Sequence, residues 1–318
     1  MSDLVAHAPR FSEQQATELA RILFNISAKA HQLPSEHDQN FRLDDQFGTR
    51  FVLKIANATE TPAVLEFQNQ AMTHVAREGA VVFGTHAPCP RVCVAANGEK
   101  ILTIDGPPGS RHFVRLLSWL PGKPLAKANP HDKDLLFSLG SFLGRIDTIL
   151  LNFNHPEAYR ELHWDLARCD EVVESRLDNI EKGEKQNLVR RFLERYRSAT
   201  APKIANLRTS VIHSDGNDYN ILVSPCDRWR QRVSGLIDFG DMVHSHTVNE
   251  LAIACAYALM GKADPLSAAA RIVAGYHGAF TLTDVELSVL FDLICMRLCA
   301  SVCNSAHQIR LAPDNDYL

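Results

Sequence analysis

Apolar and polar side chains alternate in two neighbouring segments near the start of the chain. Residues 39–44 and 50–55 both show this period of two, and turn-forming residues lie between them, so a β-hairpin is expected there. A second hairpin is expected around Asn97-Gly98, a dipeptide that favours a tight turn between two short apolar runs. A further strand is expected at 113–119. Together these segments predict an antiparallel sheet.

Helix signals accompany these strands. Ser12 followed by Gln15 resembles a capping box, which predicts a helix from there to about Ala30. Thr61-Pro62 provides the cap and first-turn proline of a second helix, and Gly79 is its expected end.

The pattern changes after the break at 120–124. Helices dominate from there on, starting at Asn129-Pro130, and only short strands are expected, near 211–212, 221–223 and 233–237. The chain is therefore expected to have an α+β fold: an N-terminal antiparallel sheet with helices, and a mainly helical C-terminal part. The boundary is placed after residue 118, so that the chain divides into a lobe of residues 1–118 and a lobe of residues 119–318.

Composition narrows the class of protein. The 318 residues are 46% apolar and 22% charged, which is enough for a full core without a metal or disulfides. The net charge of −4 does not favour nucleic acid or an anionic membrane as a partner. No apolar stretch predicts a membrane span, and the N-terminus does not read as a secretory signal. The eight scattered cysteines are typical of reduced thiols in a cytoplasmic protein, and the stripe of Cys295, Cys299 and Cys303 is expected to pack a helix face.

The most informative segment is His213-x-Asp215-x-x-x-x-Asn220, between two short apolar runs, followed by Asp238-Phe239-Gly240. This pair of motifs matches the catalytic loop and the metal-binding Asp-Phe-Gly of protein kinases. Phosphoryl transfer needs positioning and charge neutralisation: a carboxylate at the attacking hydroxyl, and oxygen ligands for magnesium. The alternative is a polar turn with Asp and Asn as turn formers.

An independent signal lies in the first lobe. Lys54 is the single lysine of an apolar strand at 51–55, and Glu66 lies in the following helix. Kinases use such a pair to hold the nucleotide phosphates. The alternative is a lysine whose ammonium group reaches solvent from an edge strand.

With these motifs in place, the sequence resembles the aminoglycoside phosphotransferase and choline kinase superfamily. These enzymes have a two-lobed, protein-kinase-like fold and phosphorylate small hydroxyl compounds. The resemblance runs from about Arg10 to the last helix. Three segments look closest to the hydroxylysine kinase branch: 38–41, 64–69, and 217–220 taken with 237–242.

The resemblance implies a role for each matching residue. Asp215 would be the catalytic base, Asn220 and Asp238 would ligate Mg²⁺, and His213 would brace the loop. Lys54 would bind the phosphates of ATP or GTP, held by Glu66. Residues 1–118 would thus form the nucleotide-binding lobe and residues 119–318 the catalytic and substrate lobe.

For the nucleotide, the resemblance implies a hinge of Ser118, Trp119 and Leu120 that meets the base, and a loop around 35–40 that covers the phosphates. Ser214 departs from the family, which usually has glycine there. The nucleotide loop also lacks the Gly-x-Gly-x-x-Gly of protein kinases.

Substrate residues are indicated more weakly. Asp218 and Asp241 could attract an ammonium group, His244 could touch the substrate, and Arg297 could receive a carboxylate. An acid and an arginine together fit a zwitterionic hydroxyamino acid. An internal salt bridge is the alternative for Arg297. Choline would favour an aromatic cage, and aromatic residues are sparse after Asp238.

The sequence thus predicts a kinase that transfers the γ-phosphate of ATP or GTP to a small amino alcohol, with 5-hydroxylysine or a similar hydroxyamino acid as the leading acceptor. The alternatives are a choline, homoserine or aminoglycoside kinase, or a pseudokinase that binds nucleotide as an interaction module. The oligomeric state stays open, a homodimer being one possibility.

Overall fold

The computed structural model describes residues 7–35, 38–84, 87–106, 109–227 and 230–311. The chain divides into two compact units, Met1–Pro121 and Gly122–Leu318. The division lies within the break expected at 120–124, beside the boundary placed after residue 118. The assignment of nucleotide binding to the first unit and catalysis to the second stays a prediction.

The first unit contains an antiparallel sheet in which β6 pairs with three other strands. The strand order is β1-β2-β3-β6-β4, and β5 also pairs with β6. The strands are β1 (Ala28–Leu33), β2 (Gln39–Asp45), β3 (Arg50–Ile55), β4 (Val92–Cys93), β5 (Leu102–Gly106) and β6 (Ser110–Ser118). The expected antiparallel sheet and its first hairpin are therefore confirmed.

The second expected hairpin is wrong in its pairing. The turn at Asn97-Gly98 does form, since the Gly98 amide donates to the Ala95 carbonyl at 3.0 Å. However, β4 and β5 each pair with successive parts of β6 rather than with each other. A turn signal specifies local geometry, whereas the partner of a strand depends on which edge is available.

Helix α2 (Glu13–Phe24) begins at the predicted capping box, with the Gln15 amide donating to Ser12 Oγ at 3.2 Å. The helix ends earlier than the expected Ala30, because Asn25 adopts a left-handed conformation (φ 56°) that closes it. Residues 28–33 instead form β1, an extra strand that pairs with β2.

Helix α3 (Pro62–Phe83) starts at the predicted Thr61 cap but continues past the expected end at Gly79. A Cβ atom at Gly79 would lie 2.7 Å from the Pro88 side chain, so this glycine permits close packing rather than helix termination. The cap is Gly84, with φ of 74°.

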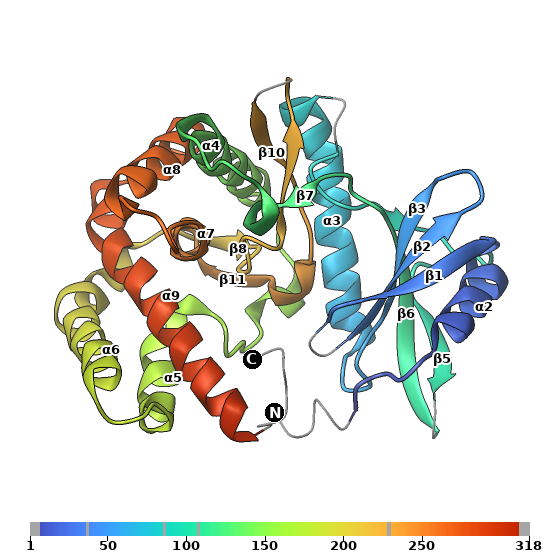
Figure 1. Ribbon diagram of the computed structural model, residues 1–318, viewed down its shortest axis with the longest axis horizontal. Coiled ribbons are helices and arrows are strands. Elements are labelled where there is room, and N and C mark those ends of the chain that lie inside the picture. The colour runs from blue at the N-terminus through green and yellow to red at the C-terminus, as the bar shows by residue number, and fades with distance from the viewer. Residues whose placement is uncertain (1–6, 36–37, 85–86, 107–108, 228–229, 312–318) are drawn as a thin grey trace. The chain divides into compact units, whose positions relative to one another are not determined.

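The two faces of the sheet have different roles. Helices α2 and α3 lie on opposite sides of it (Figure 1). The apolar core includes Phe41, Leu53 and Leu116, together with residues of α2. Lys54 points to the other face, because it pairs across the strands with Arg115, and the buried Arg115 guanidinium binds the Gln68 and Asn69 side chains of α3.

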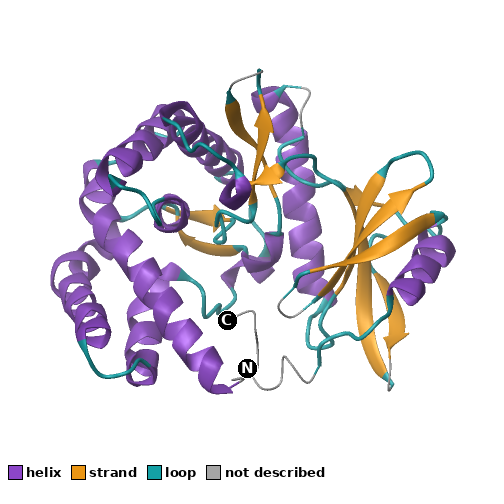
Figure 2. Ribbon diagram, in the orientation of Figure 1, coloured by secondary structure: helices purple, strands orange, loops and turns teal. Residues whose placement is uncertain are grey.

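The second unit is mainly helical, as predicted (Figure 2). Its strands form a three-stranded sheet of order β10-β9-β7 and a β11-β8 pair. The helices are α4 (Lys133–Leu150), α5 (Cys169–Arg176), α6 (Glu184–Arg195), α7 (Val248–Ala258), α8 (Pro265–Ala279) and α9 (Asp284–Leu311). The strands are β7 (Lys123–Pro124), β8 (Thr209–Ile212), β9 (Ile221–Pro225), β10 (Gln231–Leu236) and β11 (Val243–His246). Strands β7 and β11 were not anticipated, and α4 begins at the Asp132 cap rather than at Asn129-Pro130.

Glycines set the packing of α4 against α8. A Cβ atom at Gly140 would lie 1.8 Å from the Ile272 carbonyl oxygen, and one at Gly275 would lie 2.0 Å from the Phe137 carbonyl oxygen. The two backbones are therefore in direct contact at these positions. None of the described helices has the length and apolar character needed to cross a membrane.

Candidate active site

Two strand ends in the second unit present the predicted motifs beside each other. The loop His213–Asn220 connects β8 to β9, and Asp238 follows the end of β10. The Ile237 amide donates to the Asn220 carbonyl at 3.0 Å, because β9 and β10 are paired up to this point. The antiparallel pair therefore brings Asn220 and the Asp238 backbone together.

The Asp215 carboxylate is held by two amide side chains and one guanidinium. Asn217 Nδ2 donates to Oδ1 at 2.9 Å, and Asn220 Nδ2 donates to Oδ2 at 2.6 Å. Arg297 Nη2 lies 3.5 Å from Oδ1. Burial raises the pKa of Asp215 to about 8, with a further increase from Asp241, while the positive charge of Arg297 opposes the shift. A carboxylate in this range is suited to accept a proton near neutral pH.

His213 connects the loop to the Asp-Phe-Gly segment. Its Nε2 lies 3.1 Å from the Ile237 carbonyl oxygen, and its Nδ1 accepts from the Asp215 amide at 3.3 Å. Burial lowers its pKa to about 4, so the ring is neutral at physiological pH, and these contacts favour the tautomer with hydrogen on Nε2. The ring of Phe239 packs edge-on against it at 5.0 Å.

Glu250 of α7 contacts the loop His213–Asn220 and was not anticipated from the sequence. Its Oε2 accepts from the Ser214 amide at 2.8 Å. A Cβ atom at Gly216 would lie 2.7 Å from its Oε1, so the loop rests directly on the carboxyl group. Burial raises the pKa of Glu250 to about 7. Its signal in the sequence is a single acid within the apolar stretch 248–258, since a buried acid needs polar partners.

Arg297 of α9 lies in an aromatic enclosure, of which Trp164 was likewise not anticipated. Its Cζ atom lies 4.8 Å from the Trp164 ring centroid and 5.5 Å from that of Tyr257. Its Nη1 donates to the Trp164 carbonyl at 3.1 Å. The residue is only 2% exposed.

The segment after Asp238 is fixed by an arginine that the sequence did not indicate. Arg160 donates to the Gly240 carbonyl through Nη2 and to the Met242 carbonyl through Nε at 3.2 Å. The ring of Tyr159 stacks on His244 at 4.6 Å. These contacts fix the backbone on both sides of Asp241.

The residues predicted more weakly to bind the substrate differ in their surroundings. Asp241 is close enough to Asp215 to raise its pKa, and Arg297 adjoins the same carboxylate. Asp218 is half-buried, its carbonyl accepts from the Ala126 amide at 2.8 Å, and burial raises the pKa of its carboxyl. His244 lies on β11.

The predicted nucleotide residues lie in the first unit. Lys54 is on β3 opposite Asn40 and Arg115, and Glu66 is on α3. At the predicted hinge, the Ser118 amide donates to the Arg91 carbonyl at 2.8 Å and the Trp119 amide to the Arg50 carbonyl at 3.1 Å. Their N–H groups are thus engaged within the sheet.

Leu120 follows directly along the chain from this hinge pair. In the loop expected to cover the phosphates, Asn40 Nδ2 donates to Ser35 Oγ at 3.1 Å, while residues 36–37 lie outside the described residues.

The donor set of Asn220 and Asp238 fits a magnesium ion. Both side-chain hydrogen bonds of Asn220 use Nδ2, so its Oδ1 is the atom that could face a cation. Magnesium usually takes one or two protein carboxylates, with phosphates and water completing its octahedron. Within the described ranges, no group of three or more His, Cys, Asp or Glu side chains could hold a metal ion.

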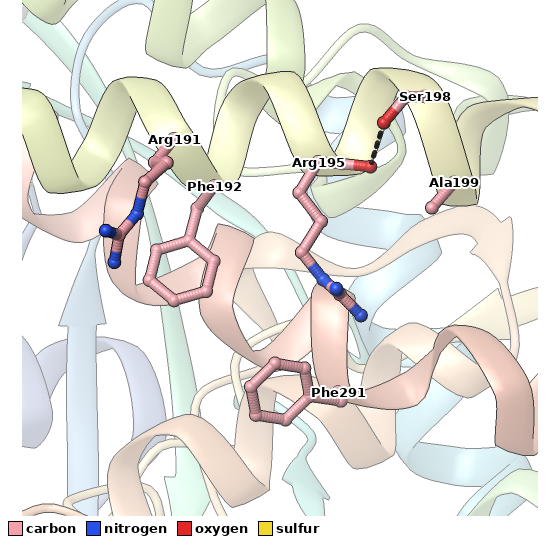
Figure 3. A pocket seen from close by; sticks show the side chains of 6 residues that line it. All are labelled: Arg191, Phe192, Arg195, Ser198, Ala199 and Phe291. Atoms are coloured by element: carbon pink, nitrogen blue, oxygen red, sulfur yellow. Dashed lines mark hydrogen bonds between the residues drawn. The ribbon is translucent and has the colours of Figure 1, made fainter.

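A surface pocket of about 460 Å³ lies elsewhere in the second unit (Figure 3). Arg195 lies over the Phe291 ring at 5.8 Å and pairs with Asp292 at 2.6 Å. The pocket contains none of the predicted site residues. Its lining is Arg191, Phe192, Arg195, Ser198, Ala199 and Phe291.

Comparison with known proteins places this geometry in a family. Residues 10–287 match the model of the phosphotransferase enzyme family. The chain is 31% identical to hydroxylysine kinase of Mus musculus over 98% of this chain and 86% of that protein. It is 29% identical to hydroxylysine kinase of Danio rerio over 97% of this chain and 87% of that protein.

Solved structures share the fold. The amicoumacin kinase in complex with AMP-PNP and Ca²⁺ has a TM-score of 0.72 at 16% identity, covering 96% of this chain and 89% of the other. The microcompartment-associated aminopropanol kinase has a TM-score of 0.63 at 18% identity, covering 93% of each chain. The expected α+β, protein-kinase-like fold is confirmed. The chain therefore belongs to the phosphotransferase enzyme family and is a kinase that acts on a hydroxyl group of a small molecule.

Proposed function

We propose that this kinase transfers the γ-phosphate of ATP or GTP to the side-chain hydroxyl of 5-hydroxylysine or a similar hydroxyamino acid. The observation that carries the proposal is the match to hydroxylysine kinases at 29–31% identity over at least 97% of this chain. The acidic character of the site around Asp215, Asp238 and Asp241 supports an acceptor that carries an ammonium group.

In this proposal Asp215 accepts the proton of the attacking hydroxyl. Its carboxylate is held through both oxygens by Asn217 and Asn220, so it is positioned before the acceptor binds. Asn220 Oδ1 and the Asp238 carboxylate would hold Mg²⁺, which neutralises charge on the phosphates when bound. His213 and Glu250 keep the loop that carries Asp215 in place.

The nucleotide would be held by the first unit. Lys54 would neutralise the phosphates and Glu66 would orient it from α3, which Arg115 anchors to the sheet. Since the N–H groups of Ser118 and Trp119 are engaged, the nucleotide base would meet the hinge through its carbonyl oxygens and through Leu120.

The acceptor would lie beside Asp215. Asp218 and Asp241 are proposed to attract its ammonium groups, and His244 to contact it from β11. Arg297 adjoins the same carboxylate. We further propose that the protein works in the cytoplasm, since all eight of its cysteines are free thiols.

The test is an acceptor screen with purified protein, Mg²⁺ and either ATP or GTP. Phosphate transfer to 5-hydroxylysine, homoserine, choline, 1-amino-2-propanol and kanamycin would be compared by kcat/KM, with an EDTA-treated sample as the metal control. We expect 5-hydroxylysine to have the highest kcat/KM and EDTA to abolish transfer. A higher kcat/KM for any other compound would make that compound, rather than 5-hydroxylysine, the proposed acceptor. Nucleotide binding without turnover on any acceptor would indicate the pseudokinase alternative.

A further inference from the structure

The Arg297 side chain has almost no contact with solvent. Its side chain is 3% exposed, and the rings of Trp164 and Tyr257 lie near its guanidinium. The Tyr257 ring is itself tied to α9, because its hydroxyl lies 3.2 Å from Ser301 Oγ. Cation–π contacts of this kind are strongest where the cation is desolvated.

Both terminal nitrogens of the guanidinium face groups of the protein. Nη1 donates to the Trp164 carbonyl at 3.1 Å, and Nη2 lies 3.5 Å from Asp215 Oδ1. Nε is enclosed and has no hydrogen-bond partner in the described part of the chain. Recognition of a free carboxylate by arginine uses two parallel N–H groups along one edge. The Arg297 side chain is only 3% exposed, so it presents no such edge to solvent.

The surroundings of Arg297 also explain why a cation is needed here. Asp215 and Glu250 are both acids in a buried setting, and both are stabilised as carboxylates by the charge of Arg297. Asp241 and Asp238 act in the opposite direction on Asp215 by repulsion. Removing one partner of a buried ion pair leaves an uncompensated charge, which is unfavourable. We therefore expect the Asp215 carboxylate to depend on Arg297 for its position.

We propose that Arg297 is a positioning residue for Asp215, and that the carboxylate of the acceptor is bound by other groups. Trp164 and Tyr257 hold the guanidinium, and the guanidinium holds the carboxylate at the reacting hydroxyl. This inference rests on the proposed role of Asp215 as the group that accepts the hydroxyl proton. It replaces the expectation that Arg297 receives the acceptor's carboxylate.

The test compares Arg297→Met and Arg297→Lys on two acceptors, one with a carboxylate (5-hydroxylysine) and one without (1-amino-2-propanol). We expect Arg297→Met to lower kcat by about 100-fold on both acceptors, the cost of a reacting group displaced by about 1 Å, with little change in either KM. Arg297→Lys should recover part of kcat, since it keeps the charge but loses the planar fork.

Trp164→Leu is a second variant that leaves Arg297 in place but removes one of its rings. We expect it to lower kcat on both acceptors in the same way, by a smaller factor. Arg195→Met is the matched control: Arg195 also pairs with a carboxylate of α9, Asp292, at 2.6 Å, but outside the site. It should leave both kcat and KM unchanged, and thermal unfolding of every variant checks that it folds.

Two outcomes would overturn the inference. An increase in KM confined to the acceptor with a carboxylate would make Arg297 a substrate ligand, and an unchanged kcat in Arg297→Met would show that Asp215 does not depend on it. Nucleotide hydrolysis by water, measured without acceptor, gives the same comparison independently of the acceptor. If the wild-type protein phosphorylates neither acceptor, the proposed choice of acceptor is wrong. The role of Arg297 is then tested by comparing the rates of nucleotide hydrolysis of wild type and Arg297→Met.

Discussion

Ser214 has a left-handed backbone conformation (φ 66°) in the loop that carries Asp215. Its hydroxyl is buried and has no hydrogen-bond partner among the described residues. Residues with a Cβ atom pay about 1–2 kcal/mol for this conformation, whereas glycine does not. The departure from the glycine usual in the superfamily therefore carries a cost at this position.

We expect Ser214→Gly to raise the free energy of unfolding by about 1 kcal/mol, because it relieves the backbone and removes the unpaired hydroxyl, against some added entropy of the unfolded chain. Urea unfolding of both proteins measures this. Ser210→Gly in β8 is the control: its hydroxyl is bonded to Thr247 Oγ1 at 2.8 Å, so that variant should lose stability. A less stable Ser214→Gly would show that the serine is accommodated without strain.

Asp215 is the residue on which turnover is expected to depend most. Asp215→Asn keeps the shape of the side chain but removes the group that accepts a proton. We expect kcat to fall by about 10²–10⁴-fold, the usual contribution of a general base, while nucleotide binding measured by calorimetry stays the same. Turnover near the wild-type value would show that another group accepts the proton of the attacking hydroxyl.

At the scale of elements, the contact between α4 and α8 depends on glycine. Gly275→Ala would place a methyl group 2.0 Å from the Phe137 carbonyl oxygen, so the helices must separate. We expect a loss of at least about 3 kcal/mol in the free energy of unfolding, the upper end of the usual cost of overpacking.

Gly278 of the same helix is the matched control, since an added Cβ atom there meets nothing within 4 Å. Gly278→Ala should be neutral or stabilising by up to about 1 kcal/mol, because alanine is the better helix former. Equal effects of the two substitutions in chemical unfolding would mean that the close approach of α4 and α8 does not limit stability.

Helix α7 links stability to pH through Glu250. Burial raises the pKa of Glu250 from its ordinary 4.5 to about 7, so folding favours the protonated carboxyl. The resulting stability is fully present below pH 4.5 and is lost as the pH rises through about 7, an effect of up to about 3 kcal/mol.

We expect Glu250→Gln, which is neutral at every pH, to lose less stability than wild type between pH 5 and pH 8. Burial also raises the pKa of Asp147, and the charge of Glu250 raises it further, so the difference between the two proteins includes this coupling. Unfolding free energies measured across this pH range give the two slopes. Parallel slopes would show that Glu250 does not titrate differently on folding.

At the scale of the whole molecule, nucleotide binding is proposed for the first compact unit and proton transfer for the second. Lys54→Met in the first unit should raise the KM for nucleotide and lower kcat/KM by about 100-fold, because a charge at the phosphates is lost. Asp215→Asn in the second unit should lower kcat instead. Lys29→Met, at an exposed position of β1 in the same sheet, is the control and should leave both constants unchanged. A normal KM for nucleotide in Lys54→Met would show that Lys54 does not bind the phosphates.

The elements that were predicted well have signals contained within a few residues. The capping box at Ser12 and the alternation in 39–44 and 50–55 needed no distant partner. The errors lie where packing decides. Asn25 ends α2 early and allows β1 to join the sheet, and Gly79 serves the contact with Pro88 rather than ending α3.

The sequence by itself determined that this is a phosphoryl-transfer enzyme, because Asp215, Asn220 and Asp238 lie in short motifs whose spacing is set by a loop and a strand end. Only the tertiary structure decided what surrounds them. Glu250 reaches Ser214 across 36 residues and Arg297 reaches Trp164 across 133. The physical reason is that a buried carboxylate takes its charge and hydrogen-bond partners from whichever helices pack around it, and no local pattern encodes that packing.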